Sequence, residues 1–209
     1  MVQLSQGQQG IVALLRRALA LDTQAHARIA VREGGIECFV TTPFSVVAAR
    51  RAQGTFGSHG AVYRAADLLN PEGSELVVEP HPSAGGALSW PGALPPAEGY
   101  ERVESIPGAA VRQLVDAGRG LAKQFSTAMG PPASLLNSTV ISCSTDTSTV
   151  DVPMRAVFAL NACGFIPTDT SEPSRNRLLV SLSGRWVRID AYYGTVYYRA
   201  GTNSLTDLL

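Results

Sequence analysis

Residues 80–99 hold five prolines and four glycines, and this stretch constrains the possible folds more than any other feature. Proline lacks the backbone N–H that helices and interior strands need, so regular structure should not continue through it. We predict a Pro/Gly-rich linker over 80–104 that separates residues 1–79 from residues 105–209. Trp90, in the middle of this stretch, should anchor the linker to a core. Whether the two halves pack as one domain or as two stays open.

The N-terminal half reads as a helix followed by a β-meander. Apolar residues recur every three or four positions over 8–21, which predicts an amphipathic helix. Gly34–Gly35 is a two-residue turn signal between predicted strands 26–33 and 36–42. Segment 44–51 is a strand or a short helix, with Val46 and Val47 favouring a strand. Residues 53–60, rich in glycine and small polar residues, are predicted to be a loop.

The C-terminal half reads as helices followed by a second meander. We predict helices over 107–125 and 153–163, and a helix or a strand over 133–142. A Ser/Thr-rich loop is expected over 143–150. The predicted final strands are 177–182, 185–191 and 195–199.

The two meanders are similar when the sequence is shifted by 149 positions. Gly35 then falls on Gly184, Arg28 on Arg177 and Val47 on Val196. Turn glycines set strand register, so their coincidence indicates a duplicated helix-plus-meander unit. Chance similarity between two meanders is the alternative. The predicted fold class is α+β, with two helix-plus-antiparallel-meander units joined by the proline-rich crossing and helices.

Composition excludes several classes of protein. The chain has 209 residues, of which 45% are hydrophobic and 16% charged, so it should fold around a core. Its 17 basic and 17 acidic side chains cancel, which argues against a general nucleic-acid binder or a membrane-surface protein. No apolar stretch approaches a transmembrane span, and the N-terminus does not read as a signal peptide. We therefore expect a cytoplasmic protein without a membrane contact.

Motifs for catalysis or metal binding are missing from the sequence. It has no GxSxG, no GxxxxGK[ST], no HExxH and no GxGxxG. The three cysteines are widely spaced and should be reduced, buried thiols. We predict no catalytic residue, no metal and no cofactor. An enzyme of unrecognised type stays as an alternative, and it would need His59 or His81 to meet a carboxylate in a pocket.

The C-terminal strands carry the densest set of aromatic and charged residues. Alternation over 185–191 places Trp186, Arg188 and Asp190 on one face, opposite Val187 and Ile189. Aromatic residues next to arginine are typical of binding hot spots. The predicted binding residues are Trp186, Arg188, Tyr192, Tyr193 and Tyr197. Ordinary cross-strand packing would account for the same residues.

A winged helix that binds DNA is a second alternative, based on the order helix, segment, helix and terminal hairpin. The helix over 153–163 would then enter the major groove. It offers only Arg155 and Asn161 for this task, so nucleic acid is an unlikely partner.

Two segments resemble those of uncharacterised actinobacterial proteins. They are Leu94–Pro95–Pro96 with the following 99–103, and the ending that runs from Gly184 to Tyr197. This resemblance covers about the C-terminal half, and it implies no activity or site residue. The residues as a whole favour a non-enzymatic binding or protein-interaction module, with a homo-oligomer or another protein as partner.

Overall fold

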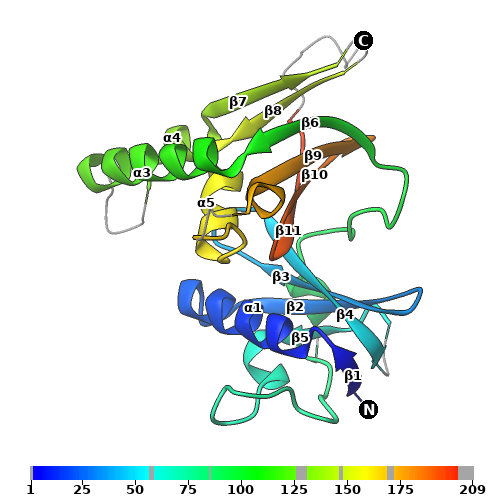
Figure 1. The fold of residues 1–209 in the computed structure, drawn as a ribbon. Helices are drawn as coiled ribbons and strands as arrows, with labels where there is room; N and C mark the ends of the chain where they lie inside the picture. The colour runs from blue at the N-terminus through cyan, green and yellow to red at the C-terminus, as the bar shows by residue number, and fades with distance from the viewer. Residues whose placement is uncertain are drawn as a thin grey trace, which may run out of the picture.

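The computed structural model describes residues 2–56, 59–84, 86–125, 131–145, 148–168 and 172–201. Five strands lie in the N-terminal half: β1 (Val2–Gln6), β2 (His26–Arg32), β3 (Gly35–Thr41), β4 (Val47–Phe56) and β5 (Val62–Arg64). Six lie in the C-terminal half: β6 (Glu101–Pro107), β7 (Thr139–Ser144), β8 (Thr149–Pro153), β9 (Arg177–Ser183), β10 (Trp186–Ala191) and β11 (Gly194–Arg199). The fold is α+β, as the sequence predicted (Figure 1).

Three longer helices accompany these strands: α1 (Gln8–Leu21), α3 (Gly108–Phe125) and α5 (Met154–Ala162). Shorter ones are η1 (Ala65–Leu68), α2 (Gly86–Ser89), α4 (Ala133–Asn137) and η2 (Pro173–Asn176). The amphipathic pattern over 8–21 therefore matches α1 at both ends. Among the described residues, no helix has the length and hydropathy to cross a membrane.

One pseudo-symmetric sheet contains strands from both halves. Within the described residues it has nine strands in the order β5-β2-β3-β4-β11-β10-β9-β6, with β1 also paired to β4. Strands β4 and β11 pair antiparallel, Val47 opposite Tyr197. Outward from this pair, the first three strands of each half follow the same order, β4-β3-β2 and β11-β10-β9, whereas the outermost strands differ, since β5 follows its meander in the chain and β6 precedes its meander. The order strand, helix and three strands also occurs twice, as β1-α1-β2-β3-β4 and β8-α5-β9-β10-β11, in agreement with the predicted repeated units.

The three longer helices lie on one face of the sheet and form the main core there (Figure 1). Helix α1 buries Ile11, Leu14 and Leu15 on this face, while α5 is buried along most of its length. Burial of each such apolar side chain stabilises the fold by about 1.5–3 kcal/mol. The apolar residues that predicted an amphipathic helix over 8–21 thus form the face of α1 that packs against the sheet.

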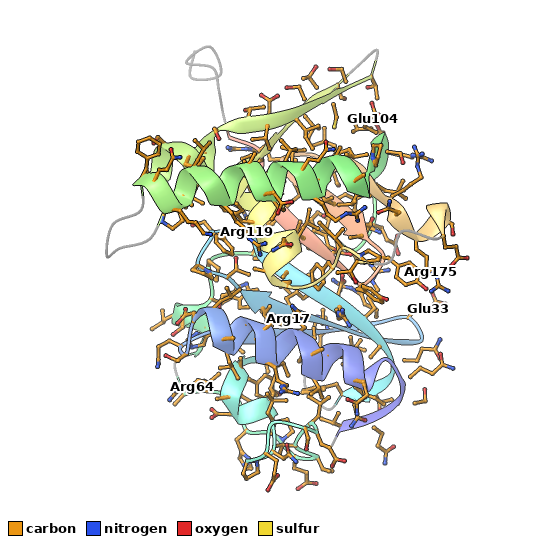
Figure 2. All side chains as sticks on the ribbon, turned by 60° about the vertical axis from the view of Figure 1, so that its left-hand side comes forward. Arg17, Glu33, Arg64, Glu104, Arg119 and Arg175 are labelled. Atoms are coloured by element: carbon orange, nitrogen blue, oxygen red, sulfur yellow. The ribbon has the colours of Figure 1, made fainter. Side chains whose placement is uncertain are left out.

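The two units also meet on the helical face. The Arg17 guanidinium in α1 donates to the carbonyl oxygen of Ala162 at the end of α5, over 3.5 Å. The rings of Phe44 and Phe158 lie 6.1 Å apart. A hollow of about 470 Å³ lies between the units, with Arg17 and Arg119 at its rim. Figure 2 shows these two arginines on α1 and on α3.

The linker crosses the opposite face of the sheet. Trp90 packs there in a smaller core with Phe39 and Tyr197, and Leu94 and Tyr100 lie against the same cluster. The prediction that Trp90 anchors the linker is therefore confirmed. The linker therefore covers part of this face of the sheet.

Three predicted loop or linker segments contain strand residues at one or both ends. Strand β4 continues to Phe56 through Gly54, whose missing side chain lets β1 approach, since a Cβ there would overlap the Gln3 carbonyl oxygen. Strand β6 begins inside the predicted linker and includes Pro107, which was expected in the first turn of a helix. Residues 143–144 and 149–150 belong to the paired strands β7 and β8, in which Cys143 lies opposite Val150 and both side chains are buried.

Candidate binding site

The linker face of the sheet carries three of the five predicted binding residues. Arg188 in β10 lies opposite Tyr197 in β11, and Trp186 lies opposite Arg199. Tyr197 is only 2% exposed. Arg188 lies over the ring of Tyr100 from the linker, 5.3 Å from its centroid, and its Nε is 2.7 Å from Asp190 Oδ2. Linker and sheet therefore already cover Tyr197 and Arg188.

A buried acidic side chain holds Tyr197 in place. The Tyr197 phenol donates to Oε1 of Glu37 over 2.9 Å. Glu37 also accepts from Arg32 over 3.2 Å and lies 3.5 Å from Arg51. Burial, and secondly the charge of Glu37, raise the pKa of Tyr197 far above its ordinary value. Tyr197 is thus a neutral donor that joins the two units.

The other two predicted residues form a separate group at the β10–β11 turn. Tyr192 and Tyr193 are 47% and 45% exposed, with their rings 4.9 Å apart and edge-on. The Arg175 guanidinium lies 5.1 Å from the centroid of the Tyr192 ring, and Arg50 lies 5.8 Å from that of Tyr193. The predicted set is therefore split into two groups. Its role in binding stays a prediction.

A pocket of about 390 Å³ lies beside Trp186, where the two units meet. The N-terminal unit contributes Val47 and the preceding turn that starts at Thr41. The linker contributes Pro91, and the C-terminal unit contributes Trp186 and Tyr197 with neighbours on β11 and α5. Pockets of this size, with apolar walls and a few polar groups, are typical ligand sites.

Two arginines are the charged residues of this pocket. Arg155 comes from the first turn of α5, and Arg199 from the end of β11. The Arg199 guanidinium lies 4.9 Å from the centroid of the Trp186 ring. Within the described part of the chain, neither arginine has a hydrogen bond to an acceptor or an ion pair. The Nε of Arg155 is buried and has no hydrogen-bond partner.

The same two arginines line a second hollow of about 510 Å³. It continues toward the β7–β8 hairpin, where Asp151 and Thr149 form part of its wall. Tyr198 lies in both walls and donates from its phenol to the carbonyl oxygen of Asp151 over 2.8 Å. Burial raises the pKa of Tyr198 well above its ordinary value. The two hollows therefore adjoin at Arg155, Tyr198 and Arg199.

The turn at the pocket rim has an unusual backbone. Ser45 has φ of 56° and is exposed, and among the described residues it is the one non-glycine residue with positive φ. The Thr42 hydroxyl donates to the carbonyl oxygen of Val46 over 2.6 Å, which holds the turn closed. This fixed turn places Val46 and Val47 in the pocket wall.

Sequence reasoning found part of this site. Trp186 was selected from strand alternation and Tyr197 from the density of aromatic residues in the final strands, whereas Arg199 was not among the predicted binding residues. Arg155 was noted only for the winged-helix alternative. The local sequence does not show that residues 41–47 lie near β11, because the pairing of β4 with β11 brings them there. Pro91 is placed by the linker, next to the packed Trp90.

The structure does not support the winged-helix alternative. Met154, Ala156, Val157, Phe158, Ala159 and Leu160 of α5 are all buried, so this helix cannot enter a DNA groove. His59, named for the enzyme alternative, accepts a hydrogen bond at Nδ1 from the Val31 backbone N–H over 3.0 Å. Among the described residues, no three His, Cys, Asp or Glu side chains are grouped to hold a metal ion.

Solved structures with a similar fold are bacterial DNA polymerase sliding clamps. The clamp of Pseudomonas aeruginosa has 14% sequence identity and a TM-score of 0.53, over 97% of this chain and 65% of that chain. The clamp of Caulobacter crescentus has 11% identity and a TM-score of 0.53, over 96% and 65%. The chain thus spans slightly less than two thirds of these proteins. At such low identity, the likeness establishes a sliding-clamp-like fold and nothing more.

Comparison with sequence families divides the chain within the linker. No curated protein matches the sequence. Residues 2–90 match a domain of unknown function, DUF8010. Residues 95–203 match a second domain of unknown function, DUF8185. Since this second match spans more than half of the chain, the protein belongs to the DUF8185 family.

Proposed function

We propose that the chain is a non-enzymatic protein-interaction module that binds its partner at the pocket beside Trp186. The observation that carries this proposal is the pocket itself. It combines an aromatic ring, two unpaired arginines and apolar walls at the point where two units and the linker meet. Tryptophan, tyrosine and arginine dominate binding energy at protein interfaces, particularly in pockets that exclude water.

The fold supports an interaction role. A similar solved structure is named as the subunit beta of DNA polymerase III, a component of a larger enzyme. The balance of 17 basic and 17 acidic side chains favours a protein partner over nucleic acid. The partner is either a second copy of this chain or another protein, and the following experiment distinguishes the two.

A photo-crosslinking amino acid at position 91 tests the proposal. Pro91 is exposed and lines the pocket, so p-benzoylphenylalanine there should crosslink the partner in the native host. Pro96 is exposed on the same linker outside the pocket and provides the matched control position. Mass spectrometry of the adduct identifies a second copy or another protein.

Trp186→Ala should reduce the adduct at least tenfold, whereas Tyr192→Ala should not, because Tyr192 lies outside the pocket. Native mass spectrometry of the same variants gives the oligomeric state. An adduct of equal yield at positions 91 and 96, or one unaffected by Trp186→Ala, would rule out this pocket as the interaction site.

A further inference from the structure

The charge of the pocket indicates what part of a partner it receives. Arg155 and Arg199 stand on the wall that the two hollows share. Neither has an acceptor among the described residues, whereas Arg188 on the same sheet face is paired with Asp190. A guanidinium stays charged at every physiological pH. The pocket therefore presents two positive charges that have no ion-pair partner among the described residues.

The geometry at Arg155 makes this arrangement costly without a ligand. Its Nε is buried and has no hydrogen-bond partner in the described part of the chain. A buried donor without an acceptor costs about 1–3 kcal/mol, and somewhat more in a charged group. An acceptor that reaches this Nε would remove the penalty. The planar guanidinium fits a carboxylate or a phosphate, because both offer two oxygens to two N–H groups.

The surroundings favour a single carboxylate over a phosphate chain. Val46, Val47, Pro91 and the Trp186 ring form an apolar wall beside the arginines. The neighbouring hollow contains Asp151, whose carboxylate accepts from the Ser142 hydroxyl over 2.7 Å and would repel a polyanion. One carboxylate next to one apolar side chain matches both the charge and the walls.

We propose that Arg155 and Arg199 bind a carboxylate of a linear peptide segment, while the adjacent apolar side chain packs on Trp186 and Val47. This inference rests on the proposed function and specifies the partner as a peptide that presents one carboxylate next to an apolar side chain. The carboxylate comes either from an Asp or Glu side chain or from a free C-terminus, and the two sources present the same chemistry to the arginines.

Matched peptide probes test this inference on the full chain by NMR. The protein has two tryptophans, so its ¹H–¹⁵N spectrum has two indole peaks, which Trp186→Phe assigns. The side-chain source is represented by N-acetyl-Leu-Asp-amide against N-acetyl-Leu-Asn-amide. The C-terminal source is represented by N-acetyl-leucine against N-acetyl-leucinamide. Each pair differs in one carboxylate.

We expect the carboxylate member of at least one pair to shift the Trp186 indole peak, with at least tenfold higher affinity than its amide. The pair that responds identifies the source. Arg199→Gln should weaken this binding at least tenfold. Arg185→Gln removes the same charge from an exposed turn outside the pocket and should have little effect. Arg155→Gln provides the second test, and thermal unfolding checks that each variant folds.

Three results would overturn the carboxylate assignment. These are equal affinity for acid and amide, no Trp186 shift with any probe at 20 mM, or tighter binding of inorganic phosphate or a short oligonucleotide. Crosslinking from position 91 reports separately on whether the pocket contacts a protein. A crosslink lost in Trp186→Ala together with equal acid and amide affinity leaves the interaction module standing and refutes only the carboxylate.

Discussion

Tyr197 in β11 donates its phenol hydrogen bond to Glu37 in β3, and this contact joins the two units on the linker face of the sheet. Glu37 is 2% exposed, so its carboxylate depends on protein donors in place of water. Arg32 supplies another of these donors. The contact therefore links the stability of the C-terminal unit to a charge buried in the N-terminal unit.

Tyr197→Phe should lower the free energy of unfolding by about 1–3 kcal/mol, because it removes a donor from a buried charged acceptor. Urea denaturation of Tyr197→Phe, Glu37→Gln and the double variant gives the coupling energy, which we expect to be about 1 kcal/mol or more. Tyr192→Phe is the control, since Tyr192 is about half exposed. Additive single effects would show that the two side chains do not interact.

Two glycines in α3 should respond in opposite directions to alanine. A Cβ on Gly118 would lie 2.8 Å from Met154 Sδ and 2.9 Å from Phe158 Cε1, so Gly118→Ala should destabilise by about 1–3 kcal/mol. Gly120 has no atom within 4 Å of such a Cβ, so Gly120→Ala should stabilise by about 1 kcal/mol through helix propensity. Thermal unfolding measures both. Stabilisation by both substitutions would mean that α3 does not pack on α5 as closely as described.

Loss of the Trp90 side chain should release the linker. Trp90 is 5% exposed, and Trp90→Ala should cost about 3–5 kcal/mol because it empties a packed position. Leu88, at 94% exposure, provides the control, and Leu88→Ala should change stability by less than about 0.5 kcal/mol. Urea denaturation measures stability, and limited proteolysis at 80–100 measures release. An unchanged cleavage rate in Trp90→Ala would contradict anchoring.

Alkaline pH should destabilise the protein through its tyrosines. Burial raises the pKa of Tyr100 to about 12, and it also raises the pKa values of Tyr197 and Tyr198. Above pH 10 the unfolded chain loses these protons while the folded chain keeps them, so the folded state is progressively less favoured. Stability should be constant below about pH 9 and fall from about pH 10 to 12.

Absorbance at 295 nm and circular dichroism, followed together, check this expectation. Tyr100, Tyr197 and Tyr198 should ionise at the pH at which the fold is lost. Ionisation of these three tyrosines near pH 10 with an intact fold would show that their phenols are accessible to solvent.

Sequence periodicity was sufficient for elements whose own residues carry the signal. Helix α1 and the Gly34–Gly35 hairpin follow from local apolar spacing and turn chemistry. Strand β6 was missed because an edge strand with Glu101, Arg102 and Glu104 has little apolar alternation. Gly54 read as a loop residue, because a single sequence does not distinguish a turn glycine from one that admits a neighbouring backbone.

The candidate site likewise combines features that local sequence predicts with features that depend on contacts between distant residues. Alternation along 185–191 placed Trp186 and Arg188 on one face, which is a local property. The linker covers Arg188 and Tyr197 because of the path it takes across the sheet. The contacts of Trp90 and Tyr100 with residues distant in the sequence determine this path. The pocket needs Val47, which lies 150 positions before its strand partner Tyr197.

The pairing of β4 with β11 also has a consequence for folding during synthesis. The edge of β4 at Val47–Ala49 has its partner only when residues 195–197 have been made. Until then the first unit exposes unpaired backbone groups, which other nascent strands could occupy. Contacts over such a sequence separation close slowly. We therefore expect slow refolding in vitro and an early dependence on ribosome-associated chaperones, with β1 protecting only the neighbouring part of the β4 edge, residues 53–56.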